Sequence, residues 1–236
     1  RHGSYQALLD DAAVEAVYIS LPNHLHAEWT VKCAEAGKHI LCEKPLATNF
    51  AEAMFMIDAV ERHDVFFMEA FMYRCHPQTQ KLVELIRDGA VGQVQNIHAS
   101  FGFRMSDYQN IRLRHDAAGG GIMDVGCYTM SIARLIAGAA MGRDFCDPAQ
   151  VSGWGRVGEA KVDEWANASV LFPGDILATL VCGVRAANEN KVRVFGTEGW
   201  LEIPSPYFAS RDAGVSRIIV GKWSGGEPQT VQIKAD

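Results

Sequence analysis

The N-terminal part of the chain alternates between short apolar runs and amphipathic stretches. Residues 14–21 and 65–68 are rich in β-branched and aromatic side chains, and residues 39–42 form another apolar run, so each is predicted to be a β-strand. Residues 26–36 have apolar positions at helical spacing, and a second helix is expected after a cap at Thr48 or Asn49. This order of strand, helix, strand, helix and strand predicts a parallel α/β sheet.

Beyond Phe71 the pattern changes. Residues 80–86 and 123–136 have helical spacing, whereas most of the rest consists of strand-like runs joined by turn sequences such as Pro173-Gly174-Asp175. Strands are expected at residues 93–104, 150–157, 164–172, 176–185, 191–195 and 200–203, and in a final hairpin at 217–233. The predicted fold class is α/β plus α+β, with a partial parallel sheet in domain 1–73 and a large, mostly antiparallel open sheet in domain 74–236.

Composition and charge argue against several classes of function. The chain has a formal net charge of -6, a pI near 5.8 and no run of lysine or arginine, so we expect no nucleic-acid partner. No apolar run approaches the length of a membrane span, so we expect no membrane association and a cytoplasmic location. The 6 cysteines lack Cys-x-x-Cys spacing, which favours reduced core thiols over disulfides or zinc ligands.

The stretch from His39 to Asn49 places an ionisable pair at the end of a predicted strand. Pro45 has no amide hydrogen and ends the strand, so Glu43 and Lys44 fall at its carboxyl end, where ligands bind in open α/β sheets. A lysine there can exchange a proton with a reacting hydroxyl or carbonyl, and a neighbouring carboxylate can fix its direction and charge. An exposed ion pair at a strand end is the alternative.

Asp124 and Tyr128 are four residues apart on a predicted helix and therefore share one face. The helix follows Gly119-Gly120-Gly121, which allows the backbone to come close to a ligand. A carboxylate beside a phenol could handle a proton, although a capping aspartate and a core tyrosine would give the same pattern.

The loop after residues 14–21 reaches the same expected sheet edge as Lys44. It contains Leu21, Pro22, Asn23 and His26, whose polar members could hydrogen-bond a cofactor; a capping asparagine and a partly buried histidine are the alternative. We expect no metal site, because no cysteine or carboxylate cluster accompanies His24-x-His26. Arg74, Arg104 and Arg112 could anchor a polar substrate, although solvated surface arginines are the simpler interpretation.

Taken together, these segments resemble the glucose–fructose oxidoreductase/inositol dehydrogenase (Gfo/Idh/MocA) family of NAD(P)-dependent oxidoreductases. The matching segments occur in family order at residues 18–26, 37–47, 69–74, 119–128 and 196–200. Tyr128 stands where many relatives carry histidine. A tyrosine at this position resembles the branch that contains glucose–fructose oxidoreductase and dimeric dihydrodiol dehydrogenase. The resemblance implies a partial Rossmann-type, dinucleotide-binding domain at 1–73 and a substrate and oligomerisation domain at 74–236.

The resemblance also implies roles for individual residues. Leu21, Pro22, Asn23, His26, Glu43, Lys44 and Pro45 would line NAD or NADP, with a cis Lys44-Pro45 peptide. Lys44 and Tyr128, supplied by different domains, would polarise and protonate the reacting oxygen of a sugar, polyol or dihydrodiol, and Asp124 would orient the substrate or the lysine. Tyr73, Arg74, Arg104 and Arg112 are the candidates for substrate binding. A homo-oligomer through the C-terminal sheet is expected.

One departure from the family pattern produces a second hypothesis. Family members open with a strand, a G-x-G-x-x-G turn and a second strand, and no such unit precedes residues 14–21. The chain is therefore expected to be a fragment or a shortened protein. The alternative to an oxidoreductase is a truncated, non-catalytic relative that acts as a ligand sensor or an assembly partner.

Overall fold

The computed structural model describes residues 1–209 and 215–234. The chain divides into two compact units, of which the first comprises Arg1–Phe71 and Gln109–Gly119 and the second comprises the remaining described residues. The first unit therefore includes the segment that carries Arg112, which the sequence pattern assigns to the later domain.

A parallel three-stranded sheet forms the centre of the first unit, as predicted. Its order is β1 (Ala16–Ile19), β2 (His39–Cys42) and β3 (Phe67–Glu69), and both neighbouring pairs are parallel. The apolar run of β2 predicts a buried strand, but Leu41 is 38% exposed while Ile40 and Cys42 are buried. The strand is thus buried on one face only, and β2 is the middle strand of the sheet.

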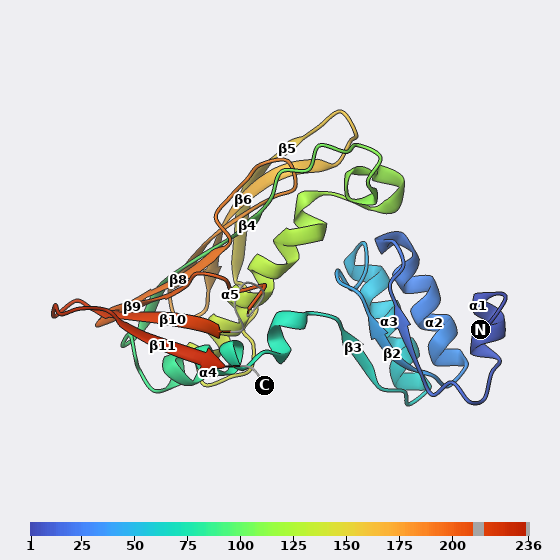
Figure 1. Cartoon of the computed structure of the whole chain (residues 1–236), viewed down its shortest axis with the longest axis horizontal. Coiled ribbons are helices and arrows are strands. Elements are labelled where there is room, and N and C mark those ends of the chain that lie inside the picture. The colour runs from blue at the N-terminus through green and yellow to red at the C-terminus, as the bar shows by residue number, and fades with distance from the viewer. Residues whose placement is uncertain (210–214, 235–236) are drawn as a thin grey trace. The chain divides into compact units, whose positions relative to one another are not determined.

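Helices cover that buried face. The first unit contains α1 (Tyr5–Leu9), α2 (His26–Glu35) and α3 (Phe50–Arg62), with short helical turns η1 (Asn23–Leu25), η3 (Ile111–Leu113) and η4 (His115–Ala117). α2 and α3 lie side by side (Figure 1) and enclose a core that includes Ile19, Ile40 and Met56. Asn49 caps α3, since its side chain accepts the N–H of Glu52 at 3.0 Å, which confirms the predicted start of this helix.

The second unit is built on an eight-stranded sheet with the order β11-β10-β9-β8-β4-β7-β6-β5. All neighbouring pairs are antiparallel except β4 and β7, which are parallel, so the prediction of a mostly antiparallel sheet is confirmed. The strands are β4 (Val94–Gly102), β5 (Gln150–Val157), β6 (Asp163–Phe172), β7 (Ile176–Gly183), β8 (Lys191–Gly196), β9 (Gly199–Ile203), β10 (Val215–Lys222) and β11 (Gln229–Lys234).

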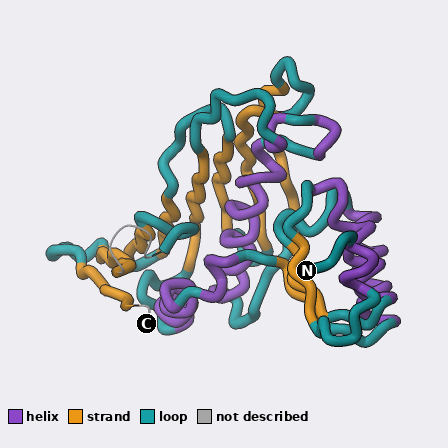
Figure 2. Tube along the Cα trace, turned by 45° about the vertical axis from the view of Figure 1, so that its right-hand side comes forward, coloured by secondary structure: helices purple, strands orange, loops and turns teal. Residues whose placement is uncertain are grey.

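One face of this sheet carries the helices of the second unit. These are η2 (Met72–Cys75), α4 (Pro77–Arg87), a π-helical turn η5 (Ile122–Gly126) and α5 (Cys127–Ala140), which follows η5 without a break. α5 lies over the sheet and runs roughly along its strands (Figure 2), and it contacts β4 and β7. Ile97 and Phe101 of β4 and Ile132 of α5 are buried on this face. The expected helix at 123–136 therefore exists, but it begins as a π-helix and extends further.

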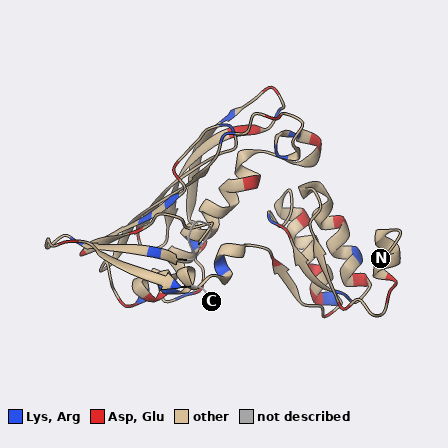
Figure 3. Ribbon diagram, viewed as in Figure 1, with Lys and Arg blue, Asp and Glu red and all other residues tan. Residues whose placement is uncertain are grey.

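The described residues show mixed charge and one apolar helical run. Lysine and arginine are interspersed with aspartate and glutamate over both units (Figure 3), in keeping with the absence of a basic run in the sequence. By length and composition, the helical run His115–Ala140 could cross a membrane, contrary to the expectation that no apolar run is long enough. However, 56% of its most apolar window is buried inside the protein, and core helices give the same signal.

Candidate active site

The carboxyl end of β2 presents Glu43 and Lys44, as the sequence predicts. Glu43 Oε1 accepts a hydrogen bond from the Tyr18 hydroxyl at 2.5 Å, and its Oε2 accepts the Lys44 N–H at 3.2 Å. This carboxylate raises the pKa of Tyr18 to about 12, chiefly through the hydrogen bond. Glu43 is thereby fixed by the neighbouring strand, and Lys44 is half-buried beside it.

The turn that follows is held by two other elements. The Lys44-Pro45 peptide is cis, as the resemblance implies, and Pro45 is buried. The Leu46 N–H donates to Glu69 Oε1 at 2.8 Å, so the carboxylate at the end of β3 anchors the loop after β2. Sequence reasoning gave Glu69 no role, although a carboxylate at the end of a third parallel strand is a usable signal.

His26 joins this turn to the loop after β1. Its Nδ1 lies 2.8 Å from the Pro45 carbonyl oxygen and its Nε2 lies 2.8 Å from the Leu21 carbonyl oxygen. A carbonyl oxygen can only accept, so the tautomer of the ring decides which nitrogen donates. His26 is fully buried and supports the edge by joining the Leu21 and Pro45 backbones. Pro22, in the same loop, is half-buried.

Asn23 is engaged within the first unit. Its Nδ2 donates to the Ala118 carbonyl oxygen at 2.8 Å, which ties the loop after β1 to the segment Gln109–Gly119. Ala118 has a φ of 53°, and Arg112 is exposed on the same segment. The side-chain amide oxygen of Asn23 remains an acceptor that the Ala118 contact does not use.

Asp124 and Tyr128 lie on one continuous helix in the second unit. Asp124 belongs to the π-helical turn and Tyr128 to the first turn of α5, and they are 8% and 5% exposed. The Tyr128 ring centroid lies 5.3 Å from that of Phe101, 5.5 Å from that of Tyr207 and 5.9 Å from that of Tyr73. These rings enclose the body of the phenol and leave it little freedom to change rotamer.

The other predicted substrate-binding residues of the second unit differ in exposure. Tyr73 is 2% exposed, and its hydroxyl lies 2.9 Å from Ser131 Oγ, so it supports Tyr128 from within the ring cluster. Arg74 is exposed, with its guanidinium 4.5 Å from the centroid of the Phe145 ring, and Arg104 is exposed after β4. The exposure of Arg74 and Arg104 is consistent with solvated surface side chains and also with anchoring of a polar substrate.

The buried cysteines have the properties of core thiols. Burial raises the pKa of Cys33 to about 11, that of Cys42 to about 12 and that of Cys182 to about 11. A thiol that stays protonated at neutral pH is a poor nucleophile. Within residues 1–209 and 215–234, no group of three histidine, cysteine or acidic side chains is arranged to hold a metal ion.

A glycine pattern in the second unit does not have the context of a nucleotide-binding turn. The letters G-x-G-x-x-G occur at residues 153–158, but Gly153 and Gly155 lie on β5, which is an antiparallel edge strand. The fingerprint needs a tight turn between a parallel strand and a helix, so this match carries no cofactor assignment.

Comparison with known protein families assigns both units. Residues 2–71 match the model of an oxidoreductase family with an NAD-binding Rossmann fold, and residues 79–202 match the GFO/IDH/MocA C-terminal domain. These two matches follow the order of the two units along the chain.

Individual relatives cover most of the chain. It is 32% identical to trans-1,2-dihydrobenzene-1,2-diol dehydrogenase of Mus musculus over 86% of this chain and 59% of that protein. It is 48% identical to D-xylose 1-dehydrogenase (NADP(+)) 2 of Haloferax volcanii over 58% of this chain and 42% of that protein. The chain thus spans less than two thirds of the length of these relatives.

A solved structure shares the fold of the whole chain. The aldose-aldose oxidoreductase of Caulobacter crescentus, solved with glycerol, has a TM-score of 0.85 and 30% identity over 99% of this chain and 68% of that chain. The family models, which together match most of the chain, agree with this similarity. The chain is therefore a member of the Gfo/Idh/MocA oxidoreductase family.

Proposed function

We propose that this protein is an NAD(P)-dependent oxidoreductase that moves a hydride between nicotinamide and a hydroxyl or carbonyl carbon of a sugar, polyol or dihydrodiol. The observation that carries the proposal is Lys44, half-buried at the carboxyl end of the middle strand of a parallel sheet, within a family of nicotinamide-dependent enzymes. The substrate class is supported by relatives named for xylose and for dihydrobenzenediol.

The residues at the carboxyl edge of the first unit suit the ribose beside the nicotinamide. Glu43 is a fixed carboxylate whose oxygens each retain a lone pair for a ribose hydroxyl, and the amide oxygen of Asn23 is a second acceptor. When bound, the nicotinamide supplies the acceptor or donor of the hydride. Pro22 and Pro45 would give this edge a rigid backbone, and His26 and Glu69 would hold its two loops in place.

Lys44 and Tyr128 would share the handling of one proton. In the oxidation of an alcohol, the phenolate of Tyr128 would accept the hydroxyl proton while a bound nicotinamide would take up the hydride, and Tyr128 would return that proton in the reverse direction. The Lys44 ammonium would favour the phenolate and polarise the reacting oxygen. Asp124 would orient a substrate hydroxyl or the lysine.

Substitution of these two residues tests the proposal. Lys44→Met and Tyr128→Phe are each expected to lower kcat by about 10²-fold to 10⁴-fold, because each removes a group that acts on the transferred proton. Lys32→Met and Tyr108→Phe are matched controls, since Lys32 pairs with Glu28 on the surface and Tyr108 is 46% exposed. Undiminished oxidation of an aldose or dihydrodiol with NAD⁺ or NADP⁺ in both test variants would refute the mechanism.

We also propose that the protein forms a homodimer through the face of the large sheet opposite α5. We call this surface the open sheet face and define it by two rows of side chains that run across the strands. One row is Leu171, Leu177, Asn96, Phe195 and Trp200, and the other is Ser169, Thr179, His98, Arg193 and Glu202. None of these ten residues is buried, and the aromatic and aliphatic members are typical of protein interfaces.

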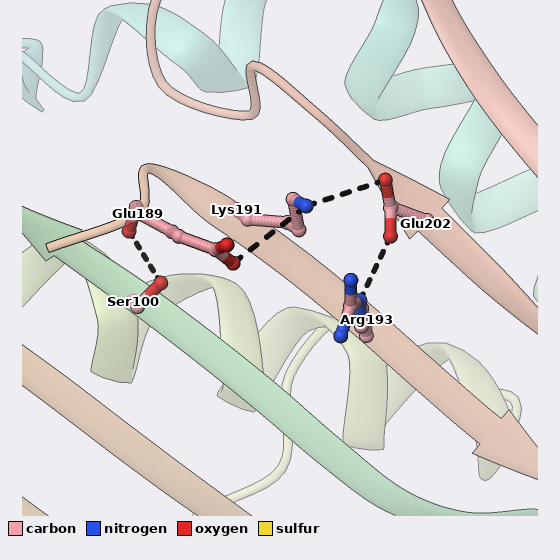
Figure 4. Close-up of polar contacts among 5 residues, drawn as sticks. All are labelled: Ser100, Glu189, Lys191, Arg193 and Glu202. Atoms are coloured by element: carbon pink, nitrogen blue, oxygen red, sulfur yellow. Dashed lines mark hydrogen bonds and ion pairs between the residues drawn. The ribbon is translucent and has the colours of Figure 1, made fainter.

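The charges of the open sheet face are paired within the sheet. Glu202 bridges Arg193 at 2.8 Å and Lys191 at 3.5 Å, and Lys191 also lies 3.6 Å from Glu189 (Figure 4). The Ser100 hydroxyl donates to the Glu189 carbonyl oxygen in the same cluster. Charges that already have partners cost less to remove from water, so this face can be covered by a second copy.

The oligomeric state tests this second proposal. Light scattering is expected to give the mass of a dimer for the native protein and of a monomer for Leu177→Asp, since Leu177 is 51% exposed on the open sheet face. Val151→Asp is the control, because Val151 is 57% exposed on β5 and lies beside Val170 on the face that carries α5. A native protein that remains monomeric at high concentration would contradict the proposal.

A further inference from the structure

A carboxylate from the sheet caps the helix that carries Asp124 and Tyr128. Asp163 stands at the start of β6, and its Oδ2 accepts the backbone N–H of Ile122 at 2.7 Å. Burial raises the pKa of Asp163, and the backbone N–H groups of Ile122 and Gly121 act against that shift. The helix has no side-chain cap from its own N-terminal residue, so a residue 41 positions later supplies the cap.

The glycines before the helix make room for this carboxylate. A Cβ at Gly120 would lie 2.3 Å from Asp163 Oδ1, and a Cβ at Gly121 would lie 3.1 Å from Oδ2. Gly120 also has a φ of 123°, which side chains other than glycine rarely adopt. The sequence suggested that these glycines let a ligand approach, whereas in the structure two of them admit the Asp163 side chain.

The anchored segment is the π-helical turn η5. A π-helical turn is rare and persists only where its surroundings hold it, and relaxation to an α-helix would rotate Asp124 relative to Tyr128 about the helix axis. The other end of the turn packs closely against β7, because a Cβ at Gly126 would lie 3.0 Å from Cys182 Sγ. Asp163 therefore anchors the beginning of the turn, and the space beside Cys182 admits only glycine at its end.

We propose that Asp163 is a positioning residue that holds the π-helical turn and so sets the orientation of Asp124 relative to Tyr128. This inference rests on the proposed function, in which those two residues handle the proton. Asp163 accepts hydrogen bonds from backbone N–H groups, and the proposal assigns it no contact with substrate or cofactor. Its effect on turnover would come entirely through the helix.

The environment of the Tyr128 phenol gives a readout that needs no activity. Tyrosine labelled with ¹³C at Cζ is incorporated, and the Tyr128 resonance is identified by its loss in Tyr128→Phe. Asp163→Ala is expected to shift this resonance and the Ile122 amide resonance, and to lower kcat by about 10-fold to 100-fold with KM for the cofactor unchanged. Asp163→Asn keeps an acceptor oxygen for the Ile122 N–H and is expected to restore most of both properties.

Two further variants separate positioning from stability. Val170→Ala creates a cavity under the same strand and is expected to lower stability while leaving the Tyr128 resonance in place. Gly121→Ala crowds Asp163 Oδ2 at a residue with an ordinary helical φ of -66°, and is expected to shift the Tyr128 resonance in the same direction as Asp163→Ala, which keeps the test decisive if Asp163→Ala does not fold.

The inference is overturned if the Tyr128 resonance and kcat stay unchanged in Asp163→Ala. If Asp163→Ala does not fold, the same result in Gly121→Ala overturns it. A shift that Asp163→Asn does not reverse would also overturn it. If Lys44→Met and Tyr128→Phe both leave turnover intact, the proposed function fails, and the resonance shift still decides whether Asp163 positions the helix.

Discussion

The Tyr18 hydroxyl donates a hydrogen bond to Glu43 across two neighbouring parallel strands, with 2.5 Å between the oxygen atoms. β1 thus orients the carboxylate that precedes Lys44. The strand register places Tyr18 opposite Leu41 and Ile19 opposite Cys42, so the contact lies at the carboxyl edge of both strands. The first unit therefore presents Glu43 in a defined direction before any ligand binds.

This hydrogen bond predicts an alkaline titration. The pKa of Tyr18 is raised from 10.0 to about 12, so the neutral phenol is favoured in the folded protein. Its contribution to stability is fully present below pH 10 and is lost as the pH rises towards 12. Ultraviolet difference titration should show an ionisation near pH 12 that is absent in Tyr18→Phe and moves to lower pH in Glu43→Gln. Ionisation of Tyr18 at its ordinary pH would contradict this assignment.

His26 is predicted to be the main polar support of the candidate cofactor edge. His26→Leu removes the imidazole nitrogens that face the carbonyl groups of Leu21 and Pro45 and is expected to lower the free energy of unfolding by about 1 to 3 kcal/mol. His24→Leu is the matched control, because His24 is exposed nearby on η1. Urea unfolding of both variants measures the difference, and equal stabilities would show that the two contacts contribute little.

The ring cluster around Tyr128 predicts opposite effects for two similar substitutions. Among the described residues, the buried Tyr207 hydroxyl has no hydrogen-bond partner, whereas the Tyr73 hydroxyl lies 2.9 Å from Ser131 Oγ. Tyr207→Phe is expected to leave stability unchanged or raise it by up to about 1 kcal/mol, and Tyr73→Phe to lower it by about 1 kcal/mol. Thermal unfolding compares the two, and a clear loss in Tyr207→Phe would reveal a partner for that hydroxyl.

Local patterns were sufficient to predict most elements and the positions of the central candidate residues. Alternation and turn chemistry placed the strands, and Pro45 correctly marked the end of β2 with Lys44 beside it. The order of the large sheet could not be predicted this way. β4 lies between β7 and β8, which are both far from it in the sequence. Such long-range pairing depends on the whole fold and leaves no local sequence pattern.

Residues that act from a distance were the ones that sequence reasoning missed. Glu69 anchors a loop 23 residues earlier, and Asp163 caps a helix 41 residues earlier, so neither role has a local signature. Likewise, the exposure of Leu41 depends on which face of the sheet the helices cover. The triple glycine was a real signal, but the group that approaches it is a side chain of the same protein.

The most direct test of the central claim is the transfer of deuterium from nicotinamide labelled at C4. NADH and NADPH carrying two deuterium atoms at that carbon are incubated with the purified protein and a ketose or an aldose, and the product is analysed by mass spectrometry. The account predicts a product with deuterium on the reduced carbon, formed much more slowly by Lys44→Met and Tyr128→Phe. Reduction without label in the product, or equal labelling by the native protein and both variants, would contradict it.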